Sequence, residues 1–403
     1  MKVLAIVSRW PWPARRGDQL RAHQALAALA GRHEVTLLAP SSPGLPPPVA
    51  LAATERYRPG PPAHRLAVAL RSLLRGEPLQ QPLFASADLA RRAARLAPLA
   101  DLVLLQLVRL APLARQVAGR PLLVDFVDCL SGNLERRAER DHRPLAPLLR
   151  AEARRLACAE RALLAASALG AVVAERDRAA LAAVAGPELA ARVEVIPLAV
   201  SPGRAGGSAS GGPPRLVLTG NLGYFPTREA ARWLLAEVWP AVRRARPEAE
   251  LLLAGDRPPA SLRRTAERAG ARVDPAPASL ERVLAGATLA LAPMRAGSGV
   301  PVKVLEAWAA GVPVVASPEA AAGTTARPGE ELAVAGGAEA WVTAILRLLA
   351  DPAERARLAA GGRARLALDH APARVEAHWR RAAERAAGAG PPGDRPPPPR
   401  PGR

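Results

Sequence analysis

The sequence lacks the features of a membrane-spanning, disulfide-stabilised or metal-cluster protein. No apolar run reaches the ~18 residues that span a bilayer, because Arg, Asp, Glu or Pro interrupts each one. The apolar start before Arg9 is too short for the core of a signal peptide. Two cysteines, Cys129 and Cys158, cannot build a disulfide framework, and we expect both to be small buried side chains. We therefore expect a soluble, cytoplasmic protein.

Lysine, asparagine and aromatic residues are also scarce. Two of the 56 basic residues are lysine, Lys2 and Lys303, and the only asparagines are Asn133 and Asn221. In a chain that otherwise uses arginine, an interior lysine indicates a specific need for an ammonium group. Aromatic residues make up 3% of the chain. This scarcity disfavours a nucleic-acid surface, where basic residues alternate with stacking aromatics.

The net charge of +20 predicts attraction to an acidic partner, such as nucleic acid, anionic lipid or a phosphorylated substrate. Part of this charge belongs to helices such as 134–140, where arginine and glutamate are interleaved as on a solvated face. We expect a peripheral contact with an anionic membrane, at its inner face, and no specific nucleic-acid partner.

Strand-like apolar runs alternate with helical patterns, which predicts α/β domains with parallel sheets. The stretch 201–214 is rich in Gly, Ser and Pro, as linkers are. We therefore expect two Rossmann-like domains that face a cleft, at 1–200 and 215–368. A C-terminal helix at 369–387 should return to the first domain, and the Pro- and Arg-rich tail 388–403 should be disordered.

The expected elements follow from apolar periodicity. In the first domain we expect strands at 3–7, 34–39, 102–106, 122–127, 168–174 and 193–197, and helices at 18–30 and 145–166. In the second we expect strands at 215–219, 249–254, 288–292 and 312–316. Its helices should span 227–246, 261–269, 302–310, 338–349, 352–368 and 371–386.

The most informative segment is 292–317. A predicted strand ends at Pro293, and a loop with Gly297, Ser298 and Gly299 follows it. A helix then begins near Pro301. Loop amides and the positive end of a helix form an anion site at the carboxyl edge of a parallel sheet.

Lys303 and Glu306 are three residues apart on this helix and share one face. The pair suits a nucleoside diphosphate, because an ammonium can bind phosphate and a carboxylate can accept hydrogen bonds from ribose hydroxyls. The alternative is a surface ion pair. Gly220 and Asn221, after the first strand of the second domain, permit a tight turn close to a phosphate. A plain turn is the alternative there.

In the first domain, Gly17 lets the loop after the first strand approach the cleft, and Arg21 would add positive charge there. Asp18 is the predicted N-cap of the first helix. Asp125 and Asp128 are three residues apart, so an extended chain points them to opposite faces. We choose Asp128, beyond the strand end, as the residue that contacts a substrate, with capping of the next helix as the alternative.

Segment 292–317 resembles the donor-site motif of retaining glycosyltransferases of the GT-B fold, in particular family 4 and its exopolysaccharide-associated sugar transferases. The resemblance covers most of residues 1–386 and includes, in the expected order, 173–177, 215–226, Trp239-Pro240 and 251–255. It implies transfer of a sugar from a nucleotide-diphosphate sugar to a carbohydrate or lipid-linked acceptor hydroxyl, with retention, in polysaccharide or glycolipid synthesis.

The resemblance also implies that Glu306 binds the ribose, that Lys303 binds the leaving diphosphate and that Gly17 lies across from the donor phosphates. We expect Lys303 and Asp128 to be catalytic. Ser298 departs from the pattern, since many relatives have Glu eight residues before Glu306. Leu198-Ala199 also departs, where relatives commonly have Asn-Gly.

The sequence lacks the motifs of several other kinds of active site. The six histidines show no zinc-ligand spacing, and the sequence has no nucleophile elbow, Walker loop or Gly-x-Gly-x-x-Gly after the first strand. An Asp-x-Asp metal motif is missing too, so we expect no metal and no cofactor. The alternatives are a sugar-nucleotide epimerase or phosphorylase of the same fold and, in another class, a basic nucleic-acid-binding protein.

Overall fold

A computed structural model describes residues 1–14, 16–60, 68, 71–72, 74–140, 145–203, 212–295 and 299–390. The chain divides into two compact units. The first unit contains Met1–Leu198 and the segment from Ala373, and the second contains Ala199–Pro372. Among the described residues, no helix has the length and apolarity that a membrane crossing requires. Much of the expected linker, and the tail from 391, lie outside the described residues.

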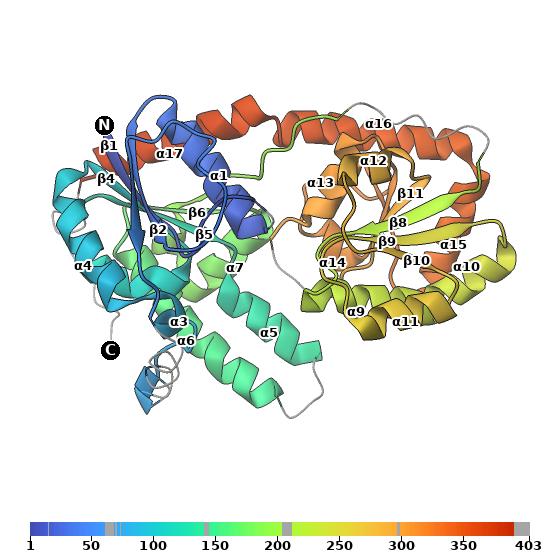
Figure 1. Ribbon diagram of the computed structural model, residues 1–403, viewed down its shortest axis with the longest axis horizontal. Helices are drawn as coiled ribbons and strands as arrows, with labels where there is room; N and C mark the ends of the chain where they lie inside the picture. Colours follow the sequence, from blue (N-terminus) through green and yellow to red (C-terminus); the bar gives the residue numbers. More distant parts are fainter. Residues whose placement is uncertain are drawn as a thin grey trace. The chain divides into compact units, whose positions relative to one another are not determined.

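The first unit is built on a seven-stranded parallel sheet with the order β3-β2-β1-β4-β5-β6-β7 (Figure 1). Its strands are β1 (Lys2–Ile6), β2 (Glu34–Pro40), β3 (Ala53–Tyr57), β4 (Leu102–Gln106), β5 (Leu122–Val127), β6 (Leu169–Val172) and β7 (Val193–Val195). The central strands β1, β4 and β5 are almost entirely buried. The prediction missed β3, because this edge strand is mostly exposed and carries polar residues.

The helices of the first unit are α1 (Gly17–Ala30), α3 (Gln81–Phe84), α4 (Ala87–Leu96), α5 (Leu130–Arg140), α6 (Ala146–Ala165), α7 (Glu175–Ala185), α8 (Pro187–Ala190) and α17 (Pro372–Gly388). Two 3₁₀ segments lie at Ala97–Leu99 and Val108–Arg115. The prediction of Asp18 as N-cap is wrong, because α1 begins one residue earlier and Arg16 occupies the cap position. Of the two cysteines, Cys129 is buried as expected, whereas Cys158 is exposed on α6.

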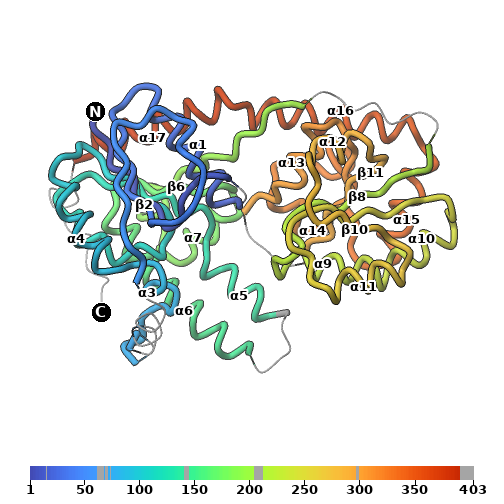
Figure 2. Tube along the Cα trace, viewed as in Figure 1, coloured from blue at the N-terminus to red at the C-terminus, as the bar shows by residue number. Residues whose placement is uncertain are grey.

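Helix α17 packs on the first unit, beside α1 (Figure 2). Arg380 donates a hydrogen bond to the carbonyl of Ala28 at 3.0 Å, and Arg385 pairs with Glu194. The ring of Trp379 is fully buried. Helix α17 is therefore part of the core of the unit that contains the N-terminus.

The second unit repeats the architecture with a six-stranded parallel sheet of order β10-β9-β8-β11-β12-β13. Its strands are β8 (Arg215–Thr219), β9 (Glu250–Ala254), β10 (Arg272–Asp274), β11 (Leu289–Ala292), β12 (Val314–Ala316) and β13 (Ala333–Val334). Both sheets are doubly wound, so the expected pair of Rossmann-like α/β units is confirmed. The edge strands β10 and β13 are too short for a sequence pattern.

The helices of the second unit are α9 (Phe225–Trp233), α10 (Trp239–Ala245), α11 (Ala260–Arg268), α12 (Leu280–Ala285), α13 (Val302–Ala309), α14 (Pro318–Ala321), α15 (Ala338–Ala350) and α16 (Pro352–Asp369). The expected continuous helix at 227–246 is interrupted by a π-helical turn, Leu234–Val238. Pro240 in the first turn of α10 lacks the N–H that a regular α-helix would need, which accounts for the interruption.

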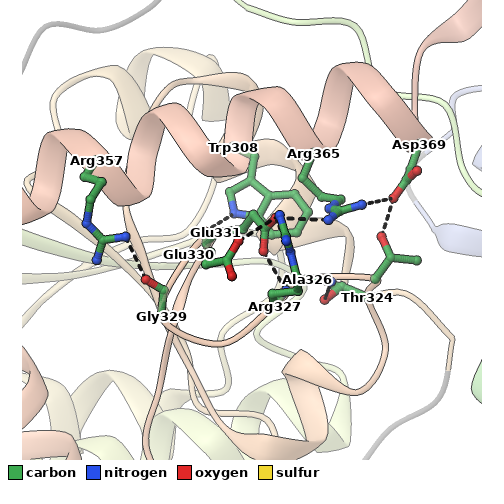
Figure 3. Close-up of polar contacts among 11 residues, drawn as sticks. Trp308, Thr324, Ala326, Arg327, Gly329, Glu330, Glu331, Arg357, Arg365 and Asp369 are labelled. Atoms are coloured by element: carbon green, nitrogen blue, oxygen red, sulfur yellow. Dashed lines mark hydrogen bonds and ion pairs between the residues drawn. The ribbon is translucent and has the colours of Figure 1, made fainter.

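A polar network fixes the side of α13 that faces α16 (Figure 3). Trp308 Nε1 donates to the carbonyl of Glu331 at 3.0 Å. The carboxylate of Glu331 accepts from Arg365 at 3.0 Å and from the amide of Arg327 at 2.6 Å. A Cβ at Gly362 of α16 would lie 2.2 Å from Trp308, so the two helices are in close contact. This anchorage holds α13, which carries Lys303 and Glu306, in one position.

Candidate active site

The candidate site of the second unit lies where its sheet changes direction. Strands β8 and β11 are neighbours, and β9 and β12 extend the sheet on opposite sides of them. In a doubly wound sheet, this switch point is where ligands bind, beyond the carboxyl ends of the strands. Gly220 and Asn221 follow β8, and the loop that leads to α13 follows β11.

The structure brings Lys303 and Gly220 together, as the sequence predicts for residues of one site. A Cβ at Gly220 would lie 3.5 Å from Lys303 Nζ, so the ammonium lies against the backbone of the turn after β8. Gly220 has φ +126°, a conformation that side chains other than glycine rarely adopt. Gly255 packs against the same turn, and a Cβ there would lie 1.8 Å from the Gly220 carbonyl oxygen.

The Lys303 ammonium is shielded from water, and few polar contacts among the described residues replace its hydration. Lys303 Nζ donates a hydrogen bond to Met294 Sδ at 3.4 Å, and a thioether sulfur is a weak acceptor. Burial lowers the pKa of Lys303 to about 8, and the charge of Glu306 opposes this shift. The contact with Met294 was not predicted. One available signal was that the chain has only two methionines.

Glu306 is one turn further along α13 and is also shielded from water. Burial raises its pKa to about 7, and the charge of Lys303 opposes this shift. No ion pair joins the two side chains in the part of the chain that the structure describes. The arrangement therefore differs from the exposed i,i+3 pairs elsewhere in the chain, such as Arg178 with Glu175 at 2.5 Å.

Of the other predicted residues of this site, the structure describes Gly299 and Asn221. Gly297 and Ser298 lie outside the described residues. Gly299 is described, with φ +64°, two residues before the N-cap of α13, Pro301. The side chain of Asn221 accepts a hydrogen bond from the Gly223 amide at 3.0 Å, so its Oδ1 stabilises the turn itself.

Asp128 follows β5 in the first unit. Val127 before it has φ +66°, which is strained for a β-branched residue. The Asp128 carboxylate accepts a hydrogen bond from Asn133 Nδ2 at 3.1 Å. The pKa of the neighbouring Asp177 is raised to about 6 by burial and by the charge of Asp128. Asp128 therefore belongs to a group of acidic side chains at the start of α5.

Arg21 and Asp125 form a closed internal pair. Arg21 Nε donates to both carboxylate oxygens of Asp125 at 2.9 and 3.1 Å, and Nη1 donates to the carbonyl of Ile196. Both side chains are at most 2% exposed. The prediction that Arg21 adds charge at a ligand site is therefore wrong. Gly17, the first residue of α1, has no described atom within 4 Å of an added Cβ.

Comparison with known proteins agrees with the fold. Residues 213–351 match the family described as glycosyl transferases group 1. Sucrose-phosphate synthase from Thermosynechococcus elongatus has 18% identity and a TM-score of 0.74, over 97% of this chain and 100% of that one. Anabaena HepE in complex with UDP-glucose has 15% identity and a TM-score of 0.66, over 95% and 99%.

WaaG, a glycosyltransferase involved in lipopolysaccharide biosynthesis, has 15% identity and a TM-score of 0.65, over 94% of this chain and 99% of that one. No curated protein matches the sequence. Such low identities show the shared fold, and the family match lies within the second unit. The chain thus has the GT-B fold of these structures, and its residues 213–351 match the glycosyl transferases group 1 family.

Proposed function

We propose that the protein transfers a sugar from a nucleotide-diphosphate sugar to an acceptor hydroxyl, with the donor diphosphate at the switch point between β8 and β11. The observation that carries the proposal is the position of the Lys303 ammonium against the Gly220 backbone, without an ion pair in the described residues. A diphosphate would supply the missing negative charge. HepE, which shares the fold, has been solved with UDP and with UDP-glucose.

The proposed chemistry needs positive charge at the leaving group. As the bond between the anomeric carbon and the diphosphate breaks, negative charge grows on the phosphate oxygens. Lys303 and the positive end of α13 stabilise this charge, and a well-placed donor contributes about 3 kcal/mol or more. Glu306 accepts hydrogen bonds from the ribose hydroxyls. Gly220, Asn221 and the loop 297–299 are proposed to line the donor.

We further propose that transfer retains the anomeric configuration. In this scheme the acceptor hydroxyl attacks the face that the diphosphate leaves, and its proton passes to the departing phosphate oxygen. The protein therefore supplies no nucleophile. Asp128 is proposed to contact the acceptor or the donor sugar, with Gly17 near the donor phosphates.

A thermal-unfolding experiment tests the donor site. We expect UDP, ADP or GDP to raise the melting temperature of the wild type, because a ligand that binds the folded state stabilises it. Lys303→Met should lose this shift. Arg264→Met, which removes an exposed cation from α11, is the matched control and should keep it. Equal shifts in both variants would show that the nucleotide does not use Lys303.

The acceptor is proposed to be a carbohydrate or lipid-linked sugar in polysaccharide or glycolipid synthesis. The net charge of +20 supports a peripheral contact with anionic lipid at the inner face of the membrane. Sedimentation with vesicles of phosphatidylglycerol and of phosphatidylcholine tests this contact at low salt. Preferential binding to the anionic vesicles is expected, and equal partition would contradict it.

A further inference from the structure

The first unit has a switch point of its own, between β1 and β4, and the donor proposal does not use it. These strands are neighbours, with β2 and β5 on opposite sides. Arg9 follows β1, and Arg109 follows β4. The two arginines therefore lie beyond the carboxyl ends of the strands, at the position where doubly wound sheets bind ligands.

The two guanidinium groups share a platform and a carboxylate. The Cζ atoms of Arg109 and Arg9 lie 4.8 and 5.5 Å from the centre of the Phe84 ring. Asp18 forms an ion pair with Arg9, and its Oδ2 lies 4.0 Å from Arg109 Nη1. Two arginines thus lie beside one aromatic ring and one carboxylate. Because Asp18 can neutralise only one of the two positive charges, one positive charge remains.

Arg109 is poorly satisfied for a shielded charge. Its Nε and Nη1 atoms are buried without a hydrogen-bond partner. The side chain is 14% exposed. Burial lowers the pKa of Arg109, as does the charge of Arg9, while Asp18 and Asp128 oppose the shift. Leaving a charged donor unpaired is unfavourable.

A structural arginine in the same unit has a different environment. Arg21 donates to both oxygens of Asp125 and to the carbonyl of Ile196. Arg109 has no comparable partner among the described residues. The internal hydrogen bonds of Arg21 therefore explain why this position is an arginine, whereas no such contacts in the described part of the chain explain the arginine at position 109.

We propose that Arg9 and Arg109 bind an oxyanion, a phosphate or a carboxylate, carried by the acceptor. An oxyanion offers several acceptor oxygens to a planar guanidinium, and Arg9, with 30% of its side chain exposed, completes the contact. This inference rests on the proposed function, because it assigns the substrate class of the acceptor.

The test is calorimetric titration of the full chain saturated with UDP, so that the donor site is occupied. The probes are glucose 6-phosphate, glucuronate and neutral glucose at constant ionic strength. We expect one of the anionic sugars to bind at least tenfold more tightly than glucose. The better of the two identifies the oxyanion.

Three variants decide whether the site is the one described. Arg109→Met and Arg9→Gln should weaken binding of the anionic sugar at least tenfold. Arg91→Gln, which removes an arginine with a 73% exposed side chain from the same unit, should not. Arg109→Met should also keep or raise the melting temperature, since it removes a shielded charge whose Nε and Nη1 atoms have no hydrogen-bond partner among the described residues.

The outcomes separate this inference from the proposed function. If UDP binds but neither anionic sugar binds better than glucose, the acceptor site is wrong and the donor site stands. Equal weakening in all three variants would also overturn the site, because it would indicate a general ionic effect. If UDP itself does not bind, the proposed function fails first.

Discussion

Each unit contains a cation and a carboxylate that are shielded from water, and the two pairs differ in how their charges are satisfied. In the first unit, Arg21 and Asp125 meet at 2.9 Å and are almost fully buried. In the second, Lys303 contacts Met294 Sδ, and the described residues show no ion pair between Lys303 and Glu306. A closed pair stabilises the fold, whereas an open pair keeps its charge for a ligand. The following changes should separate these two roles.

The largest effect should come from Lys303. Lys303→Ala should lower turnover by about 100-fold or more, because it removes a fixed charge at the leaving group. Lys303→Arg should also lower turnover strongly, since a planar guanidinium needs more volume than an ammonium beside the Gly220 backbone. Steady-state transfer, with circular dichroism to confirm the fold, measures both. Wild-type turnover in Lys303→Arg would show that the site does not require an ammonium group.

Disrupting the buried pair of Arg21 and Asp125 should lower the stability of the fold. Asp125→Asn should lower the free energy of unfolding by about 3–5 kcal/mol, because it leaves the buried Arg21 charge uncompensated. Urea unfolding followed by tryptophan fluorescence measures this change. Glu188→Gln, at an exposed acid of the same unit, should change it little. A small effect of Asp125→Asn would mean that this pair is no more structural than the open one.

The pH dependence of kcat/KM should report the open pair. Activity should rise as Glu306 ionises, with a pKa of about 7, and fall as Lys303 loses its proton, with a pKa of about 8. This profile reflects the free enzyme. Glu306→Gln should remove the acid limb and weaken donor binding. Lys303→Arg should remove the basic limb at a lower maximum. A flat profile between pH 6 and 9 would contradict both assignments.

A smaller effect is expected at the buried acids of the first unit. Burial raises the pKa of Asp177 to about 6, above its value in the unfolded chain. Its contribution to stability is therefore present at pH 4 and lost as the pH rises toward 6. Asp177→Asn should gain about 2 kcal/mol relative to the wild type between pH 4 and 7. A difference independent of pH would show that Asp177 titrates normally.

The sequence predicted the central strands for physical reasons, and it singled out the residues of the proposed donor site. Strands β4, β5 and β8 have the predicted bounds, because each is a short, mostly apolar segment. Lys303 and Glu306 were identifiable because a rare lysine and a carboxylate recur at helical spacing after a glycine-rich loop.

The side-chain groups of the first unit could not be predicted, because they depend on contacts between residues that are distant in sequence. Arg21 finds Asp125 across 104 positions, and one arginine among 54 carries no signal of such a partner. Arg9, Arg109 and Phe84 meet only when β1, β4 and α3 are assembled. The sequence alone therefore suggested a role for Arg21 that the fold excludes, and it gave no role to Arg109.

Proton uptake on nucleotide binding tests the central claim most directly. A diphosphate should raise the pKa of Lys303 from about 8, so at pH 8 binding should take up about half a proton. Glu306 is largely ionised at this pH and should contribute little. Calorimetry of UDP binding in buffers with different ionisation enthalpies measures the uptake. We expect uptake in the wild type and none in Lys303→Met. No uptake in the wild type, or the same uptake in both proteins, would contradict it.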